Sequence, residues 1–204
     1  MADDKLEIVF CDINADFLNA CKKEARDNIH LTGYYTMSLW HGDIRKLKVR
    51  NGVYISPANS FGSMGGGIDE IYDRHMFPGV SRDVMANIAA RCESGTVTMS
   101  FDHLERDSEV PKLPIGEAVI TPLDKYGKKY RGCYLVTAPT MEVPMDIQGT
   151  DNPYRAFMAT LKILEGYPDV KQLICPGLGT GVGNISGEEA AKQIVQALND
   201  FHGH

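Results

Sequence analysis

The chain has 204 residues, enough for one domain with a sizeable hydrophobic core. Its net charge of -6 argues against a general nucleic-acid-binding protein, which usually presents a basic face. The sequence shows no signal peptide and no apolar run of transmembrane length, so we expect a cytoplasmic protein without a membrane partner.

The cysteines are scattered and odd in number, and none of them forms a CxxC pair. This usage is typical of a reducing compartment, where cysteine serves as a small core residue. A zinc site or a catalytic thiol is the alternative, but the spacing gives neither of them support. We therefore expect buried free thiols, no metal and no cofactor. The residues concerned are Cys11, Cys21, Cys92, Cys133 and Cys175.

The first third of the chain alternates strand and helix patterns. Residues 6–11 are almost entirely apolar and predict a buried strand. Asp12 or Asn14 is placed to cap the following helix. Residues 34–40 predict a second strand, which ends in a turn at 41–44. The basic residues of 45–50 predict a solvated connector rather than a docking patch.

A strand at 53–56 then leads into a glycine-rich turn. A helix is predicted to begin near Ile68 and to end before Phe77, because a proline follows at the next position. Ser81 is predicted to cap another helix that runs to about Cys92. Its predicted buried stripe consists of Val84, Met85, Ile88 and Ala89.

The second half begins with an irregular stretch at 95–115, which we interpret as an elaboration at one edge of the domain, with a possible strand at 96–101. Residues 116–121 and 133–138 predict strands joined by a hairpin-like connection.

A proline-rich loop at 138–149 precedes a helix that Asn152 is predicted to cap and that ends near Gly166. Residues 171–175 predict the last strand. Ser186 with Glu189 predicts a capping box for the final helix.

This alternation predicts an α/β domain over residues 1–204, with helices on both faces of a largely parallel sheet. Ligands of such sheets lie beyond the carboxyl ends of the strands. Residues 65–67 and 177–183 are glycine loops that each follow a strand and precede a helix. Neither loop matches a Walker or dinucleotide signature, and two tight turns would explain the glycines alone. Because both loops share one arrangement, we expect them to face each other across a phosphate-bearing ligand.

Three motifs occur in order: HGDI at 41–44, ISPAN with GGGIDEIY at 55–72, and CPGLGTGVG at 175–183. Together they resemble the macro domain, an ADP-ribose-binding fold, and in particular a divergent bacterial and phage branch of it. The resemblance covers about residues 6–201. It implies a three-layer α/β/α architecture with a mixed, largely parallel sheet, and ADP-ribose or an ADP-ribosylated substrate as the partner.

The resemblance also implies roles for individual residues. Asp43, with the backbone of Ile44 beside it, would accept a hydrogen bond from the adenine amino group. Asn59 would bind the hydroxyls of the distal ribose. The two loops would wrap the diphosphate through backbone N–H groups. The other implied ligand-binding positions are Ala58, Gly65, Gly66, Gly67, Ile68, Thr140, Gly177, Leu178, Gly179, Thr180, Gly181, Val182 and Gly183.

Asp69 is the sharpest catalytic candidate, acting together with Asn59. It stands where the hydrolytic members of the resembled family carry an aspartate, and there it would activate water against the anomeric carbon of the distal ribose. An ordinary interpretation competes equally, because an aspartate in the first turn of a helix favours the helix dipole.

Three positions depart from the family pattern. Ser56 replaces the first asparagine of its NAAN motif, Thr137 replaces a common histidine, and Gly183 stands where an aromatic residue often covers the distal ribose. Either the distal pocket would then be more open, or the covering role would pass to Phe61, to Tyr72 or to the loop that contains Thr140 and Met141. These departures bear on catalysis more than on binding.

The preferred interpretation is hydrolysis of an ADP-ribosyl linkage, either mono-ADP-ribose on a protein or a small ADP-ribose derivative. The alternatives are a reader that binds ADP-ribose without turnover and a phosphatase acting on ADP-ribose 1″-phosphate. The position of the Asp69 carboxylate discriminates among them, because a carboxylate pointing into solvent would favour the reader.

Overall fold

The computed structural model describes residues 5–93 and 110–202 and contains a six-stranded sheet of order β2-β1-β6-β3-β5-β4. All neighbouring strands pair in parallel except β4, which runs antiparallel to β5. The sheet is therefore mixed and largely parallel, as predicted. The strands are β1 (Leu6–Asp12), β2 (Tyr35–His41), β3 (Gly52–Ser56), β4 (Val119–Pro122), β5 (Tyr134–Thr137) and β6 (Gln172–Cys175).

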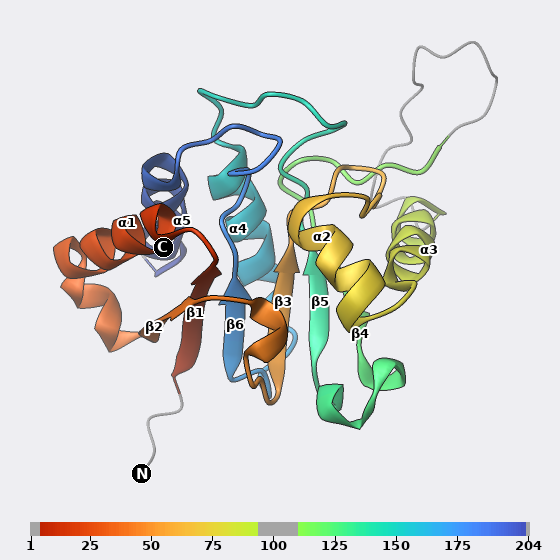
Figure 1. Cartoon of the computed structure of the whole chain (residues 1–204), viewed down its shortest axis with the longest axis horizontal. Coiled ribbons are helices and arrows are strands. Elements are labelled where there is room, and N and C mark those ends of the chain that lie inside the picture. The colour runs from red at the N-terminus through yellow and green to blue at the C-terminus, as the bar shows by residue number, and fades with distance from the viewer. Residues whose placement is uncertain (1–4, 94–109, 203–204) are drawn as a thin grey trace.

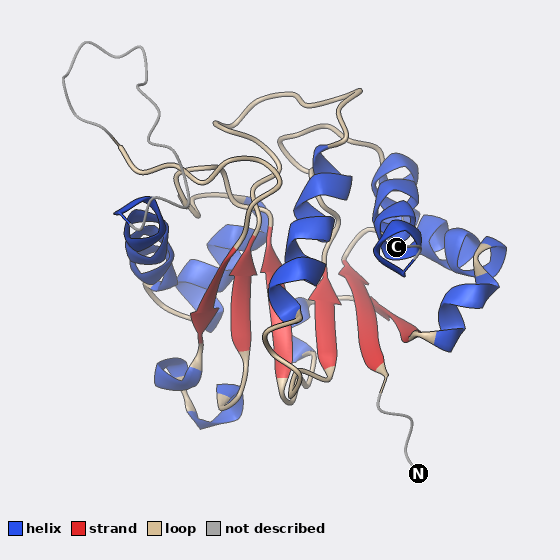
Figure 2. Cartoon of the chain, turned by 180° about the vertical axis from the view of Figure 1, so that it is seen from behind, coloured by secondary structure: helices blue, strands red, loops and turns tan. Residues whose placement is uncertain are grey.

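Helices cover both faces of this sheet (Figures 1 and 2). The first layer contains α1, α4 and α5, and the second contains α2 and α3. α2 continues directly into a π-helical turn at Tyr72–Met76. The helices are α1 (Ala15–Asp27), α2 (Gly67–Ile71), α3 (Val80–Glu93), α4 (Asn152–Leu164) and α5 (Gly187–His202).

The strands contribute to two hydrophobic cores, one on each face of the sheet. Along β1, Ile8 and Phe10 join the core under α1, α4 and α5, whereas Val9 and Cys11 join the core under α2 and α3. Successive strand side chains point to opposite faces, so a strand covered on both sides is apolar throughout. All five cysteines are buried and free, as expected.

Two predicted helix caps are wrong because each residue lies inside the helix that it was predicted to cap. α3 begins at Val80, so Ser81 lies inside its first turn, where its N–H donates to Asp73 Oδ1 at 2.8 Å. Asn152 is the first residue of α4 rather than its cap, and its Nδ2 donates to the Thr140 carbonyl at 2.8 Å. In both cases a contact between segments replaces the local hydrogen bond that the pattern predicts.

Other caps agree with the prediction wholly or in part. Asn14 accepts from the Asp16 N–H at 2.9 Å and begins α1. Ser186 accepts from the Glu189 N–H at 3.1 Å, but the Glu189 carboxylate accepts from Gln193 Nε2, which makes only half of the predicted box.

The buried stripe of α3 differs from the predicted one. It follows an i, i+4 spacing through Val80, Val84, Ile88 and Cys92, whereas Met85 is exposed. The possible strand at 96–101 lies outside the described residues. Within the described ranges, no helix combines the length and hydropathy needed to cross a membrane.

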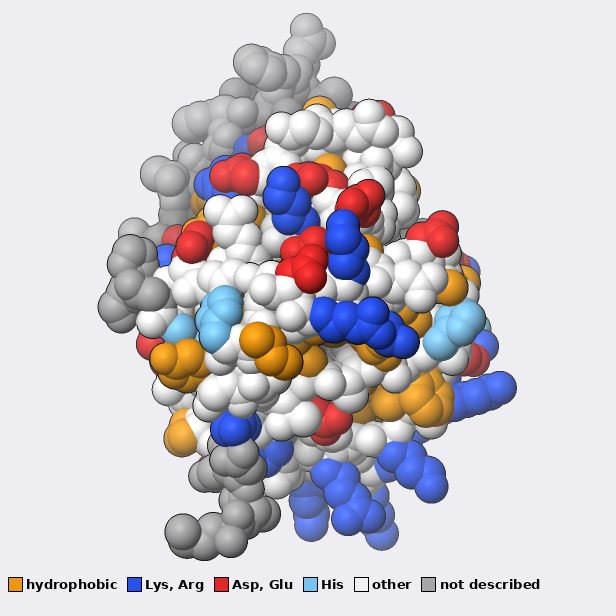
Figure 3. All heavy atoms as spheres, turned by 90° about the vertical axis from the view of Figure 1, so that its left-hand side faces the viewer, with side chains coloured by type: hydrophobic (Ala, Val, Ile, Leu, Met, Phe, Trp, Pro, Cys, Tyr) orange, Lys and Arg blue, Asp and Glu red, His pale blue; other side chains and the backbone are white. Residues whose placement is uncertain are grey.

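The connector at 45–50 is solvated as predicted, except that Arg45 pairs with Asp43. Its charged side chains are exposed, while Leu47 and Val49 pack against the core under α2 and α3. Figure 3 shows the face of the molecule on the left of Figure 1, where acidic and basic side chains intermingle over much of the surface.

Candidate functional site

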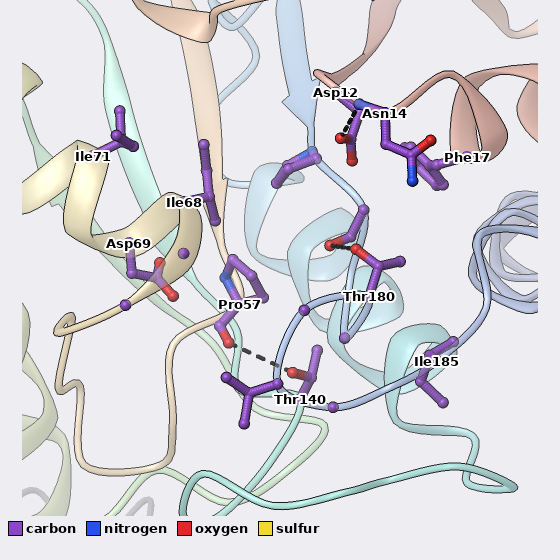
Figure 4. Close-up of a pocket in the computed structure, with 18 of the residues that line it drawn as sticks. Asp12, Asn14, Phe17, Pro57, Ile68, Asp69, Ile71, Thr140, Thr180 and Ile185 are labelled. Carbon is purple, nitrogen blue, oxygen red and sulfur yellow. Dashed lines mark hydrogen bonds between the residues drawn. The ribbon is translucent and has the colours of Figure 1, made fainter.

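A cavity of about 1210 Å³ opens at the carboxyl ends of the parallel strands. The segments that follow β1, β2, β3, β5 and β6 all contribute to its lining. Figure 1 shows these connections gathered above the sheet, and Figure 4 shows how their side chains converge. The cavity therefore lies at the sheet edge where folds of this class bind their ligands.

Every predicted ligand-binding residue lines this cavity except Leu178, and the two catalytic candidates Asp69 and Asn59 line it as well. The Leu178 side chain is fully buried in the core under α1, α4 and α5. A side chain that anchors the loop in this way leaves only its neighbours to face the cavity. Leu178 is thus a predicted ligand-binding residue whose side chain does not face the cavity.

The first glycine loop, residues 65–67, presents open backbone. A Cβ added at Gly65, Gly66 or Gly67 would meet no atom within 4 Å, and Gly67 adopts a φ of 59°. The turn that leads into this loop is held by Asn59, whose Oδ1 accepts from the N–H groups of Phe61 and Ser63, both at 3.1 Å. The amide oxygen of Asn59 is thus committed to the turn, and its Nδ2 is the group left to donate toward a ligand.

Asp69 follows this loop in the first turn of α2, and only 8% of it is exposed. Its Oδ1 accepts a hydrogen bond from Ser56 Oγ at 2.5 Å. In Figure 4 the carboxylate points from α2 toward Pro57. Burial raises the pKa of Asp69 to about 7, against the opposing effect of the Ser56 hydroxyl. Asp69 is thus a cavity-lining group rather than a solvated charge at a helix end.

Asp43, which follows β2, lines the part of the cavity where the resemblance predicts the adenine base. Asp43 caps a short 3-10 turn by accepting from the Arg45 N–H at 2.9 Å, and it also pairs with the Arg45 guanidinium at 2.8 Å. These hydrogen bonds from Arg45 lower the pKa of Asp43 to about 2. Arg45 also lines the cavity, a position that our interpretation of 45–50 as a connector missed.

The second glycine loop, residues 177–183, is tightly bonded to itself and to the loop that follows β5. Ile185 N–H donates to the Gly179 carbonyl at 3.1 Å, and Ile147 N–H donates to the Gly183 carbonyl at 3.0 Å. A Cβ at Gly183 would lie 2.6 Å from the Gly179 oxygen, so this position accommodates no aromatic side chain. Phe61 and Tyr72 are not part of the lining, whereas Met141 is.

The connection between β1 and α1 is the part of the lining that our motif reading missed. Asp12, Asn14 and Phe17 all line the cavity, and Asp12 Oδ1 accepts from the Asn14 N–H at 2.8 Å. The segment lacks glycine, so it gave no phosphate-loop signal. Its position after a parallel strand was the available signal, because all such strand ends share one edge. Among the described residues, no three His, Cys, Asp or Glu side chains are grouped to hold a metal ion.

No family model matches the sequence. The chain is 29% identical over 150 residues to an uncharacterized protein of Aquifex aeolicus, with 73% of each chain covered. It is also 29% identical over 162 residues to an uncharacterized protein of Aeropyrum pernix, with 79% of this chain and 70% of that protein covered.

Solved structures share the fold. The macrodomain of Mycobacterium tuberculosis DarG superposes with a TM-score of 0.55 at 17% identity, covering 78% of this chain and 88% of that one. A mutant of the Oceanobacillus iheyensis macrodomain, solved with ADPR, gives 0.56 at 17% identity over 78% and 74%. Thermosipho africanus DarTG in complex with ADP-ribose gives 0.51 at 13% identity over 74% and 35%. The chain has the macrodomain fold. The cavity is lined by the two glycine loops, by α2 with Asp69, and by the connection that follows β1.

Proposed function

We propose that this macrodomain binds ADP-ribose in the cavity and hydrolyses an ADP-ribosyl linkage, such as mono-ADP-ribose on a protein or a small ADP-ribose derivative. The single observation that carries the proposal is the placement of Asp69. Its carboxyl group is buried, lines the cavity and follows a glycine loop whose backbone is open to a ligand.

Binding is supported by the cavity and by the solved relatives. Two glycine-rich loops that follow strands and line the cavity can bind a diphosphate through backbone N–H groups, and no Lys or Arg is required for that. The Oceanobacillus iheyensis macrodomain mutant and Thermosipho africanus DarTG were each solved with this ligand. Asp43 and Arg45 lie at the base end, where the carboxylate would accept from the adenine amino group.

The proposed reaction is attack of water on the anomeric carbon of the distal ribose. The water oxygen forms the new C–O bond as its proton passes to the Asp69 carboxylate, and the bond to the leaving carboxylate breaks with its electron pair. The products are free ADP-ribose and the released acid. A base with a pKa of about 7 is partly ionised at neutral pH, which suits this role. Asn59 Nδ2 would hold a ribose hydroxyl and orient the sugar.

A reader that binds without turnover is the second candidate, and the Gly183 backbone favours it. Because no aromatic side chain fits there, the distal end of the cavity lacks that cover and admits water more freely. The buried, cavity-lining Asp69 weighs against the reader, because such a carboxyl costs stability without benefit unless it acts on a ligand.

Two measurements test the proposal. Calorimetry is expected to show ADP-ribose binding that Asp43→Ala weakens, and absence of binding at millimolar ligand would refute the assignment. Incubation with mono-ADP-ribosylated protein and with ADP-ribose 1″-phosphate then measures product release. We expect Asp69→Ala to lower turnover by about 10²-fold or more while affinity changes little. Binding without release of either product would establish the reader, and release from the phosphate alone would establish the phosphatase.

A further inference from the structure

The hydrogen bond between Ser56 and Asp69 joins the end of β3 to the start of α2 under the cavity. Ser56 is fully buried, and its Oγ lies 2.5 Å from Asp69 Oδ1. Asp69 lines the cavity, whereas Ser56 does not. The serine is therefore placed behind the carboxylate and out of reach of a ligand.

We propose that Ser56 is a positioning residue that acts through Asp69: its hydroxyl fixes one carboxylate oxygen at the cavity floor and favours the ionised form, so that the other oxygen faces the water. This inference rests on the proposed hydrolysis. It assigns a function to the position where the sequence departs from the asparagine of the resembled family.

The buried environment of the Ser56–Asp69 pair makes this hydrogen bond important for the charge of Asp69. The side chains packed on the same face include Tyr72 from the π turn, Tyr54 from β3 and Cys11 from β1. Burial raises the pKa of each of them, so they are neutral at physiological pH. Burial does the same for Cys175 at the end of β6. The remaining titratable groups that line the cavity are Asp12, Asp16, Asp43 and Arg45.

The stability of an ionised carboxylate among such neutral, buried side chains depends on the hydrogen-bond donors within its reach. A hydroxyl that donates to a carboxylate stabilises the charged form, and the effect is large where water is excluded. Without Ser56, Asp69 would hold its proton to higher pH and would be free to rotate. Both changes would remove the base from the reaction near neutral pH.

Thr137 provides a matched control. It pairs in register with Ser56 on the neighbouring strand, and it is equally buried. Its Oγ1 has no hydrogen-bond partner among the described residues. Thr137→Val therefore removes a buried hydroxyl of similar depth without removing a bond to Asp69.

The experiment measures the Asp69 carboxyl titration by carbon-13 NMR, assigned with Asp69→Asn, and the pH dependence of kcat/KM. Ser56→Ala is expected to move both midpoints upward by about one to two pH units, the shift that losing one hydrogen bond to a carboxylate produces. Activity would fall near pH 7 and recover at high pH. Ser56→Cys, which keeps the shape of the side chain but carries a larger and weakly donating thiol, is expected to shift both midpoints in the same direction. Thr137→Val should leave both midpoints unchanged.

An Asp69 titration that is the same in wild type, Ser56→Ala and Ser56→Cys would overturn the inference. Equal shifts in Thr137→Val and Ser56→Ala would also overturn it, because they would indicate a general packing effect. Failure of the proposed function looks different: the wild type would release no product, while the NMR titration would still report whether Ser56 controls the charge of Asp69.

Discussion

The two glycine loops look alike in sequence but differ in how their glycines are used. At Gly65 and Gly66 in the first loop, an added Cβ would meet nothing within 4 Å. In the second loop, an added Cβ would lie 2.5 Å from the Thr180 hydroxyl at Gly177 and 2.6 Å from a backbone oxygen at Gly183. The first loop has space on its open side, and the second is packed against its own chain.

This difference separates two reasons for glycine that the sequence pattern does not distinguish. At Gly177 and Gly183 of the second loop, glycine is required by the fold, because a larger residue would collide with the Thr180 side chain or with the Gly179 backbone. In the first loop, nothing in the protein itself excludes a side chain at Gly65 or Gly66. Their bare backbone therefore points to close approach by a ligand, and the first loop carries the stronger evidence for binding.

The largest expected effect concerns Asp69, which follows the first loop. Its pKa is raised from 3.8 to about 7 in the folded chain, so the unfolded state ionises first as pH rises. The stability associated with the protonated carboxyl is present below about pH 4 and is lost as pH rises to about 7. Asp69→Asn removes this loss. We expect it to raise the free energy of unfolding at pH 8 by up to about 4 kcal/mol, with little change at pH 4.

Urea unfolding at both pH values measures this effect. Asp169→Asn, at an exposed position, serves as the control and should give the same small change at pH 4 and pH 8. Equal effects of Asp69→Asn at the two pH values would show that Asp69 titrates normally. The difference between the two loops would then rest on the space around their glycines alone.

The next effect tests the packed loop. Gly183→Ala is expected to lower the free energy of unfolding by about 2–3 kcal/mol, because the methyl group would press on the Gly179 carbonyl and on Ile147. Gly181 provides the control in the same loop, since a Cβ there would meet nothing within 4 Å. Gly181→Ala should remain within about 0.5 kcal/mol of wild type. Similar thermal melts for the two variants would contradict the packing described for this loop.

Much of the fold was predictable because its signals are local. The apolar runs of β1 and β3 identify strands covered on both faces, and Asn14 caps α1 as its position suggests. The wrong predictions at Ser81 and Asn152 share a cause, since their partners Asp73 and Thr140 come from other segments. Local patterns contain no information about such contacts.

The candidate site shows the same division between features that local patterns predict and features that depend on contacts between segments. Motifs placed Asp69, Asn59 and both loops around one cavity, because strand ends in a parallel sheet share an edge. The motifs did not reveal the hydrogen bond from Ser56, the ion pair between Asp43 and Arg45, or the burial of Leu178. These depend on side-chain direction, which a one-dimensional pattern leaves open.

The smallest expected effect is the most direct test of the open loop. Gly66 has extended backbone, with φ of -159° and ψ of 162°, which alanine adopts without strain. Gly66→Ala should therefore leave the free energy of unfolding within about 0.5 kcal/mol of wild type. If a diphosphate lies against this backbone, the methyl group would hold it away, and ADP-ribose affinity should fall about tenfold, or about 1.4 kcal/mol.

Thermal melts and calorimetry on the same samples separate the two quantities. Gly33→Ala is the matched control, because Gly33 is equally open but lies outside the cavity, and it should change neither quantity. Unchanged affinity in Gly66→Ala would mean that the ligand does not approach the first loop. Lost stability would mean that this glycine, like Gly183, serves the fold. Only lost affinity with retained stability agrees with a backbone left bare for the ligand.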